Sequence, residues 1–266
     1  MVCSSGPGDR PFEERHDWVS VAVVLCGTFT YANEFGRGLL SPGGLLLGDA
    51  GGCFTCAHEH GEGDRCLSFH FEPAFFEEIA SACGARTMRF ARNNLPALRK
   101  LAPFAARAAL GVDRTPGADN GSLEELAVKI AAAALRECGG EHRTPAISKR
   151  DERRVTAVVR HMEERFAEPC ELTELARLAR LSPFHFLRVF RATTGLTPHQ
   201  HLLRTRLRSA AAALAGTSVP VTEVALASGF EDLSNFIRSF RVEYGLTPAR
   251  YRARLGRETR VHSPNA

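Results

Sequence analysis

The pattern of apolar and polar positions divides the chain into two parts. Between Trp18 and Phe71 the apolar residues form short runs, among them WVSVAVVLCGTFTY, LLSPGGLLLGD and CLSFHF, separated by Gly, Pro, Asn and Asp. Short β-prone runs with turn residues between them predict a small antiparallel barrel or sandwich. After Arg150 the apolar residues recur three and four positions apart, which predicts helices. The sequence therefore predicts an α+β protein with its strands first.

The second part has clear helix boundary signals. Thr197 followed by Pro198 is a typical helix start, and Gly195 and Gly245 are typical stops. These signals and the apolar spacing predict helices over residues 151–168, 172–181, 183–194, 198–216, 221–227, 232–244 and 248–255.

The first part also contains segments with helical spacing. They cover residues 73–83, 95–111 and 122–138, and the last carries an apolar stripe that includes Leu126, Ile130 and Ala134. Such a stripe can pack on its own domain or on a second copy of the chain. The Gly- and Pro-containing stretch CGGEHRTPAISKR then predicts a linker. We expect a first domain over 1–138, a linker over 139–150 and a second domain over 151–258.

Charge is distributed unevenly along the 266 residues. The net charge of +4 combines 14 Lys+Arg against 18 Asp+Glu up to Ser148 with 20 against 12 from Lys149 onward. A basic half indicates a polyanionic partner. No apolar run reaches membrane-spanning length, and the N-terminus lacks the apolar segment of a secretory signal. We therefore expect a cytoplasmic protein with no membrane partner, in which the eight cysteines are free thiols or metal ligands.

One sequence motif occurs twice. FLRVFRATTGLTP begins at Phe186, and FIRSFRVEYGLTP begins at Phe236. Upstream, LTELA at Leu172 matches VTEVA at Val221. Each copy reads as a short helix, a tight turn, a second helix and a glycine stop. The sequence thus predicts two helix-turn-helix units.

Spacing separates two faces on the second helix of each copy. Phe186 and Phe190, like Phe236 and Phe240, are four residues apart and are expected to anchor the helix on its core. The other face mixes polar, basic and apolar side chains, which suits a DNA major groove. Its members are Phe184, Leu187, Arg188 and Arg191 in the first copy, and Ser234, Asn235, Ile237, Arg238 and Arg241 in the second. A helical bundle that contacts no nucleic acid is the alternative interpretation.

The distance between the copies also fits DNA. The helix predicted over 198–216 has 19 residues and is about 28 Å long at 1.5 Å per residue. Successive major-groove faces are about 34 Å apart. One stiff helix could therefore hold two reading helices on one side of a duplex.

These motifs resemble a known family. Lys149 to Leu255 is similar to the DNA-binding domain of AraC/XylS transcription regulators, most clearly over VTEVALASGFEDLSNFIRSFRVEYGLTPARYR. The resemblance implies phosphate contacts by Arg191 and Arg241. It also implies that bases are read by Phe184, Leu187, Arg188, Leu233, Ser234, Asn235, Ile237 and Arg238.

The resemblance has implications for the first half as well. It implies a cupin-like antiparallel β-barrel that senses an effector or forms a dimer, with the helices of residues 73–138 as dimer or relay elements. The implied partners are double-stranded promoter DNA, RNA polymerase, a small-molecule, metal or redox effector, and a second copy of the chain. The sequence identifies no cofactor and does not distinguish activation from repression.

The stretch CFTCAHEHGEGDRC concentrates thiols and imidazoles. Cys53, Cys56, His58, His60 and Cys66 lie within fourteen residues, and such ligands suit Zn²⁺ or Cu⁺. This predicts a metal-binding or thiol-sensing site. The alternatives are small buried cysteines beside a polar loop, or an enzyme: a metal-dependent cupin, or a cysteine-based DNA-alkylation repair protein. We expect a regulator without catalytic residues.

Overall fold

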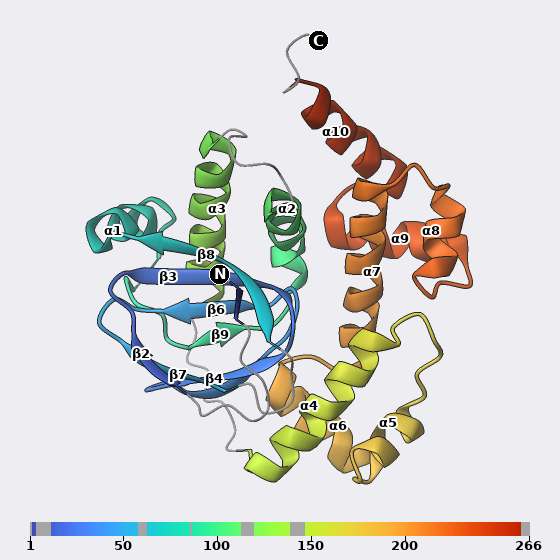
Figure 1. Ribbon diagram of the computed structural model, residues 1–266, viewed down its shortest axis with the longest axis horizontal. Helices are drawn as coiled ribbons and strands as arrows, with labels where there is room; N and C mark the ends of the chain where they lie inside the picture. Colours follow the sequence, from blue (N-terminus) through green and yellow to red (C-terminus); the bar gives the residue numbers. More distant parts are fainter. Residues whose placement is uncertain are drawn as a thin grey trace.

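The computed structural model describes residues 2–3, 12–57, 63–85, 87–112, 120–138 and 147–261. Figure 1 shows a first half built of strands and helices beside a second half built of helices. The strands of the first half are β1 (Val2–Cys3), β2 (Phe12–Arg15), β3 (Val19–Cys26), β4 (Phe29–Asn33), β5 (Gly36–Leu40), β6 (Leu45–Gly48), β7 (Cys53–Ala57), β8 (Asp64–Phe71) and β9 (Asn94–Leu95). Its helices are α1 (Pro73–Ala82), the 3₁₀ turn η1 (Arg99–Leu101), α2 (Ala102–Val112) and α3 (Asn120–Cys138).

The strands form two sheets, and the described strands do not close into the barrel that the family resemblance implies. One sheet has the order β1-β8-β3-β6-β9 and the other β2-β7-β4-β5, and all the described pairings are antiparallel. The two described sheets share no strand, so the arrangement is a sandwich. Its interior includes Phe29, Tyr31 and Leu40 from one sheet and Ala22 and Leu46 from the other. The α+β class is confirmed, and likeness to a cupin stays a prediction.

Strand β3 is buried on both faces, because successive side chains of a strand point to opposite sides. Val19, Val21 and Val23 belong to a core that the first sheet shares with α1, α2 and α3. Ala22 and Val24 point instead into the interior of the sandwich. This explains why the sequence of β3 is almost continuously apolar.

The helices of the first half cover the outer face of this sheet (Figure 1). The apolar stripe of α3 is used within its own half, since Leu126, Ile130 and Ala134 are all buried there. The predicted start of the helix expected over 95–111 is wrong. Leu95 pairs with Leu45 as part of β9, and α2 begins at Ala102. A residue before proline avoids helical backbone angles, and Pro96 therefore keeps Leu95 extended.

The second half consists of seven described helices. They are α4 (Lys149–Glu164), α5 (Leu172–Leu178), α6 (Pro183–Thr194), α7 (Pro198–Gly216), α8 (Val221–Ala227), α9 (Leu233–Tyr244) and α10 (Pro248–Val261). Among all the described helices of the chain, none is long and apolar enough to cross a membrane. The predicted bounds of α6, α7 and α8 are confirmed.

Helix α4 ends at Glu164, four residues before its predicted end. The backbone carbonyls beyond this point have partners from another helix. Arg206 on α7 donates from Nε to the Phe166 carbonyl at 2.7 Å and from Nη2 to the Glu168 carbonyl at 2.9 Å. The connection between α4 and α5 is thereby tied to α7.

The two units differ in the turn before their second helix. Arg180 has a left-handed φ of 53°, whereas Gly229 holds the corresponding position in the second unit with a φ of 81°. A non-glycine residue in this conformation is strained by about 1–2 kcal/mol.

We therefore expect Arg180→Gly to raise the free energy of unfolding by up to about 1 kcal/mol, because glycine removes the strain but loses more chain entropy. A urea titration followed by circular dichroism measures this change. Arg177→Gly, the same substitution in an exposed position of α5, should instead lower stability by about 1 kcal/mol. Equal effects of the two substitutions would contradict the strain.

Candidate nucleic-acid interface

The first unit fixes α6 through capping and aromatic packing. Ser182 caps its start by accepting from the His185 backbone N–H, and Gly195 ends it with a φ of 74°. Phe186 and Phe190 are completely buried, with ring centroids 5.4 Å apart. They pack in a core shared with α4 and α5. One face of α6 is therefore committed to the core, as the spacing predicts.

The second unit repeats this construction for α9. The Oδ1 of Asp232 accepts from the Ser234 backbone N–H at 2.8 Å, and Gly245 ends the helix with a φ of 75°. Phe236 and Phe240 are completely buried, with centroids 5.6 Å apart. The predicted anchoring role of the repeated phenylalanines is confirmed in both units.

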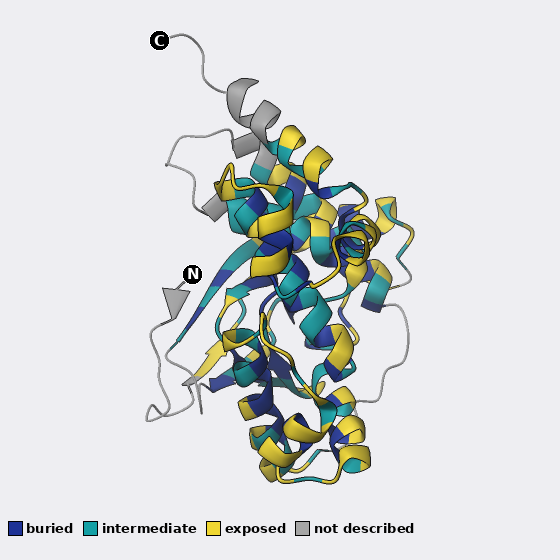
Figure 2. Cartoon of the chain, turned by 90° about the vertical axis from the view of Figure 1, so that its right-hand side faces the viewer, coloured by how far each residue is buried: buried dark blue, intermediate teal, exposed yellow. Residues whose placement is uncertain are grey.

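The residues predicted to contact DNA lie on the opposite faces of these helices. Phe184 is 82% exposed, which is unusual for a phenylalanine and leaves its ring available for a partner. In Figure 2 the helices of the second half show the same division, with buried positions inside and exposed positions outside. The exposed set is Phe184, Leu187, Arg188 and Arg191 on α6 and Leu233, Ser234, Asn235, Arg238 and Arg241 on α9, while Ile237 is half-buried.

The exposed face of α9 has the chemistry to read base edges. Arg238 Nη2 donates to Asn235 Oδ1 at 3.2 Å, so the two side chains already lie together. Arginine pairs with guanine and asparagine with adenine through two hydrogen bonds each. Ile237, beside them on a shallow surface that also includes Ser234, offers an apolar contact for a thymine methyl.

Helix α7 connects the units and carries a capping box, in which Thr197 Oγ1 accepts from the Gln200 backbone and Gln200 Oε1 accepts from the Thr197 backbone. Its 19 residues correspond to about 28 Å. Helices α6 and α9 lie toward opposite ends of α7 (Figure 1). Each unit thus keeps a fixed position relative to the other.

A polar cluster of buried and half-buried side chains holds α7 against α4. Thr205 Oγ1 and Arg208 Nη2 donate to the Glu163 carboxylate at 2.8 Å and 2.6 Å. His201 Nε2 lies 3.1 Å from Glu163 Oε1. Burial by itself raises the pKa of Glu163, but these partners, Arg208 most strongly, outweigh it and lower the pKa to about 2.

Sequence reasoning missed this cluster. The basic residues of HQHLLRTRLR contribute to the positive charge of the second half, but their spacing gives no sign that Arg208 faces a glutamate 45 positions away. A second ion pair, between Arg204 and Glu243 at 3.6 Å, links α7 to α9 in the same way. Several arginines of α7 therefore stabilise the frame of the two units.

The cysteine and histidine cluster is only partly within the described residues, since His58 and His60 lie outside them. Cys53 is exposed, whereas Cys56 and Cys66 are buried in the interior of the sandwich. Burial, and then the carboxylate of Asp64, raise the pKa of the Cys66 thiol. Among the described residues, no three His, Cys, Asp or Glu side chains could share a metal ion. A metal or thiol site that includes the two histidines stays a prediction.

Known proteins resemble the second half. A family model described as a helix-turn-helix domain matches residues 175–254. The probable transcriptional regulator LumQ of Photobacterium leiognathi is 35% identical over 91 residues, which are 34% of this chain and 37% of LumQ. The bifunctional transcriptional activator/DNA repair enzyme AdaA of Bacillus subtilis is 29% identical over 98 residues, which are 37% of this chain and 46% of AdaA. The chain thus spans less than half of either relative.

A solved structure, the DNA-binding domain of the global transcriptional factor AdpA in complex with a target DNA, has 33% sequence identity with this chain. The match covers 41% of this chain and 97% of that domain, with a TM-score of 0.39. The family model spans the helices from α5 into α10, which include both units. The second half of this chain therefore carries a helix-turn-helix domain of the AraC/XylS family of transcription regulators.

Proposed function

We propose that this chain is a sequence-specific, DNA-binding transcription regulator in which α6 and α9 enter successive major grooves of promoter DNA. One observation carries the proposal: two units of the same construction each present an exposed mixed face opposite a buried aromatic face, at the two ends of one helix. The basic charge of this half supports a polyanionic partner.

The two helices have separate tasks in this proposal. Arg238 and Asn235 of α9 read base edges, supported by Leu233, Ser234 and Ile237. Arg188 of α6 reads bases together with apolar contacts from Phe184 and Leu187. Arg191 and Arg241, near the ends of the helices, bind phosphate and contribute affinity without sequence information.

Two arginine substitutions test this division of tasks. Arg238→Ala should weaken binding to a selected site by about 1–3 kcal/mol and relax the preference at one base pair. Arg241→Ala should weaken binding to all sequences alike and reduce the salt dependence by about one phosphate contact. Titrations of labelled duplexes at several salt concentrations measure both.

Arg15→Ala, which removes one exposed charge from the first half, is the matched control and should leave binding unchanged. If Arg238→Ala and Arg241→Ala gave the same base preference and the same salt slope, the assignment of the two roles would be wrong. Absence of any selected sequence with the unmodified chain would overturn the proposed function itself.

In the same proposal the first half is the control domain of a cytoplasmic regulator. It responds to an effector or forms a dimer, and it thereby changes how the second half reaches a promoter and RNA polymerase.

The proposal assigns no catalytic residue. A cysteine-based repair reaction would need a reactive thiolate, and Cys66, whose pKa is raised, is protonated at neutral pH. Cys53 of the predicted cluster is exposed, so a methyl-transfer assay would test this residue.

A further inference from the structure

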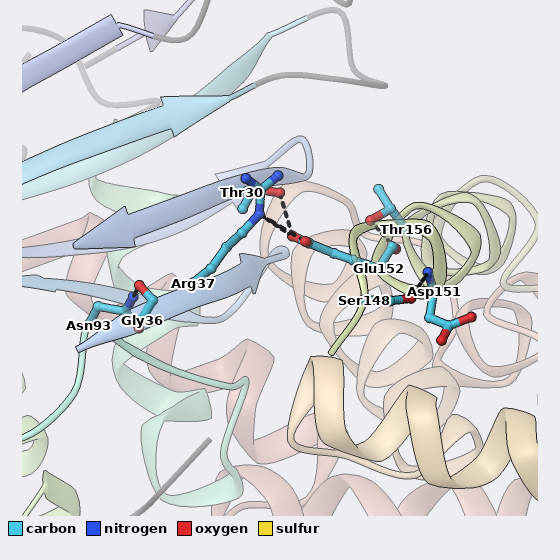
Figure 3. Close-up of polar contacts among 8 residues, drawn as sticks. All are labelled: Thr30, Gly36, Arg37, Asn93, Ser148, Asp151, Glu152 and Thr156. Atoms are coloured by element: carbon cyan, nitrogen blue, oxygen red, sulfur yellow. Dashed lines mark hydrogen bonds and ion pairs between the residues drawn. The ribbon is translucent and has the colours of Figure 1, made fainter. Parts of the chain in front are cut away.

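The first half is fastened to the second half through a buried carboxylate. Glu152, in the first turn of α4, is 8% exposed. Its Oε1 accepts from Thr30 Oγ1 of β4 at 3.0 Å and from Arg37 Nε of β5 at 2.9 Å, as Figure 3 shows. A buried charge is costly unless it is paired and hydrogen-bonded. The contact between Glu152 and its two partners therefore favours the docked arrangement of the halves.

Further contacts extend this docking along the first unit. Leu39 of β5 is buried in the core formed by α4, α5 and α6. Arg208 Nη1 donates to the Pro42 carbonyl at 2.8 Å. At the end of α6, a Cβ placed on Gly195 would lie only 2.9 Å from Pro96. The first half thus touches both the core and the C-terminal end of the first unit.

This docking places a wall beside the reading face of α6. Phe184, Leu187, Arg188 and Arg191 line a cleft of about 1090 Å³ whose other side is formed by β5 and the segment from Arg92 to Leu98. A cleft of this size is suited to a small molecule. Insertion of a helix into a major groove instead brings a phosphate backbone along each side of the helix. The docked first half forms the opposite wall of this cleft, on the side along which one of these backbones would run.

The reading face of α9 is lined differently from that of α6. The hollow along its reading face, about 640 Å³, is lined by Ser234, Ile237, Arg238, Arg241, Val242 and Thr247. Within the described part of the chain, no residue of the first half contributes to that lining. The first half does pack against the core of the second unit, through Ala102 and Ala106 of α2. The reading face of α9 stays exposed, so DNA can reach it while the halves remain docked.

We propose that the Glu152 contact is an autoinhibitory latch: in the docked state α9 is free to read DNA, and α6 reads it only after the first half has moved away. This inference rests on the proposed function and concerns its regulation. The unmodified chain then binds a two-groove site at the cost of breaking the latch, and any change that weakens the latch raises affinity through the contacts of α6.

The test uses the full chain and a duplex that it selects from a random library. Base pairs read by α6 are identified as those whose preference is lost with Arg188→Ala. Arg37→Ala should tighten binding to the intact duplex about fivefold or more, and should leave affinity unchanged for a duplex in which those base pairs are scrambled. Thr30→Val, which removes one hydrogen bond and no charge, should act in the same direction with a smaller effect.

Arg15→Ala, at the opposite edge of the same sheet, is the control and should bind both duplexes like the unmodified chain. Thermal melting establishes that each variant is folded, and Thr30→Val provides the answer if Arg37→Ala is not. Unchanged affinity of a folded latch variant for the intact duplex, or equal tightening on both duplexes, would overturn the latch while leaving the proposed function intact. Failure of the unmodified chain to select any duplex would overturn both.

Discussion

Phe240→Ala is expected to lower the free energy of unfolding of the second half by about 3–5 kcal/mol. The ring is completely buried at the centre of an aromatic cluster. Its centroid lies 5.6 Å from that of Phe236, 4.6 Å from that of Tyr244 and 5.3 Å from that of Tyr251. Truncation to alanine leaves a cavity that α9 and α10 can fill only by moving, because their other contacts fix them.

A urea titration followed by circular dichroism at 222 nm measures this loss. Val242→Ala shortens a side chain on the same helix that is 55% exposed, and should change stability by less than about 0.5 kcal/mol. Phe190→Ala in the first unit should resemble Phe240→Ala, because its ring has the same place in the repeat. A small loss for Phe240→Ala, comparable to that of Val242→Ala, would contradict the core packing described above.

Glu163→Ala is expected to cost about 3 kcal/mol at neutral pH, because it leaves the buried Thr205 and the half-buried Arg208 without their carboxylate. Arg208 loses its 2.6 Å contact and Thr205 its 2.8 Å hydrogen bond. Both partners are on α7, so the change loosens α7 from α4. Glu164→Ala, which removes an exposed carboxylate one position away, is the matched control and should have little effect.

The Glu163 contribution should also depend on pH. Its pKa is lowered from an ordinary value of 4.5 to about 2, so the unfolded chain takes up this proton first. The stabilisation is therefore fully present above pH 4.5 and is lost as the pH falls toward 2. The stability difference between the unmodified chain and Glu163→Ala, measured by urea titration across this range, should shrink accordingly. A difference that stays constant down to pH 2 would contradict the lowered pKa.

Features encoded locally could be predicted from the sequence. Thr197 and Gln200 form the capping box at the start of α7, and Gly195 and Gly245 end the helices before them. Caps, stops and the four-residue spacing of Phe236 and Phe240 act within one or two helical turns. The candidate interface could be predicted for the same reason, since all its residues lie on two short repeated helices.

Features that depend on distant contacts could not be predicted in the same way. The order of strands within each sheet depends on pairings such as Val21 with Leu47, which no short window of sequence specifies. Arg37 and Glu152 are 115 positions apart, and neither residue stands in a motif. The latch becomes visible only when the two halves are placed together. The same holds for the difference between α6, whose reading face lies beside the first half, and α9, whose reading face is open.

Hydroxyl-radical footprinting of the full chain, at saturating concentration on a duplex that it has selected, tests most directly whether two helices read two grooves. We expect two protected segments on one face of the duplex, about 10 base pairs apart. The segment lost with Arg188→Ala should be the one assigned to α6, and the segment weakened with Arg238→Ala the one assigned to α9. A single protected segment, or two segments on opposite faces of the duplex, would contradict it.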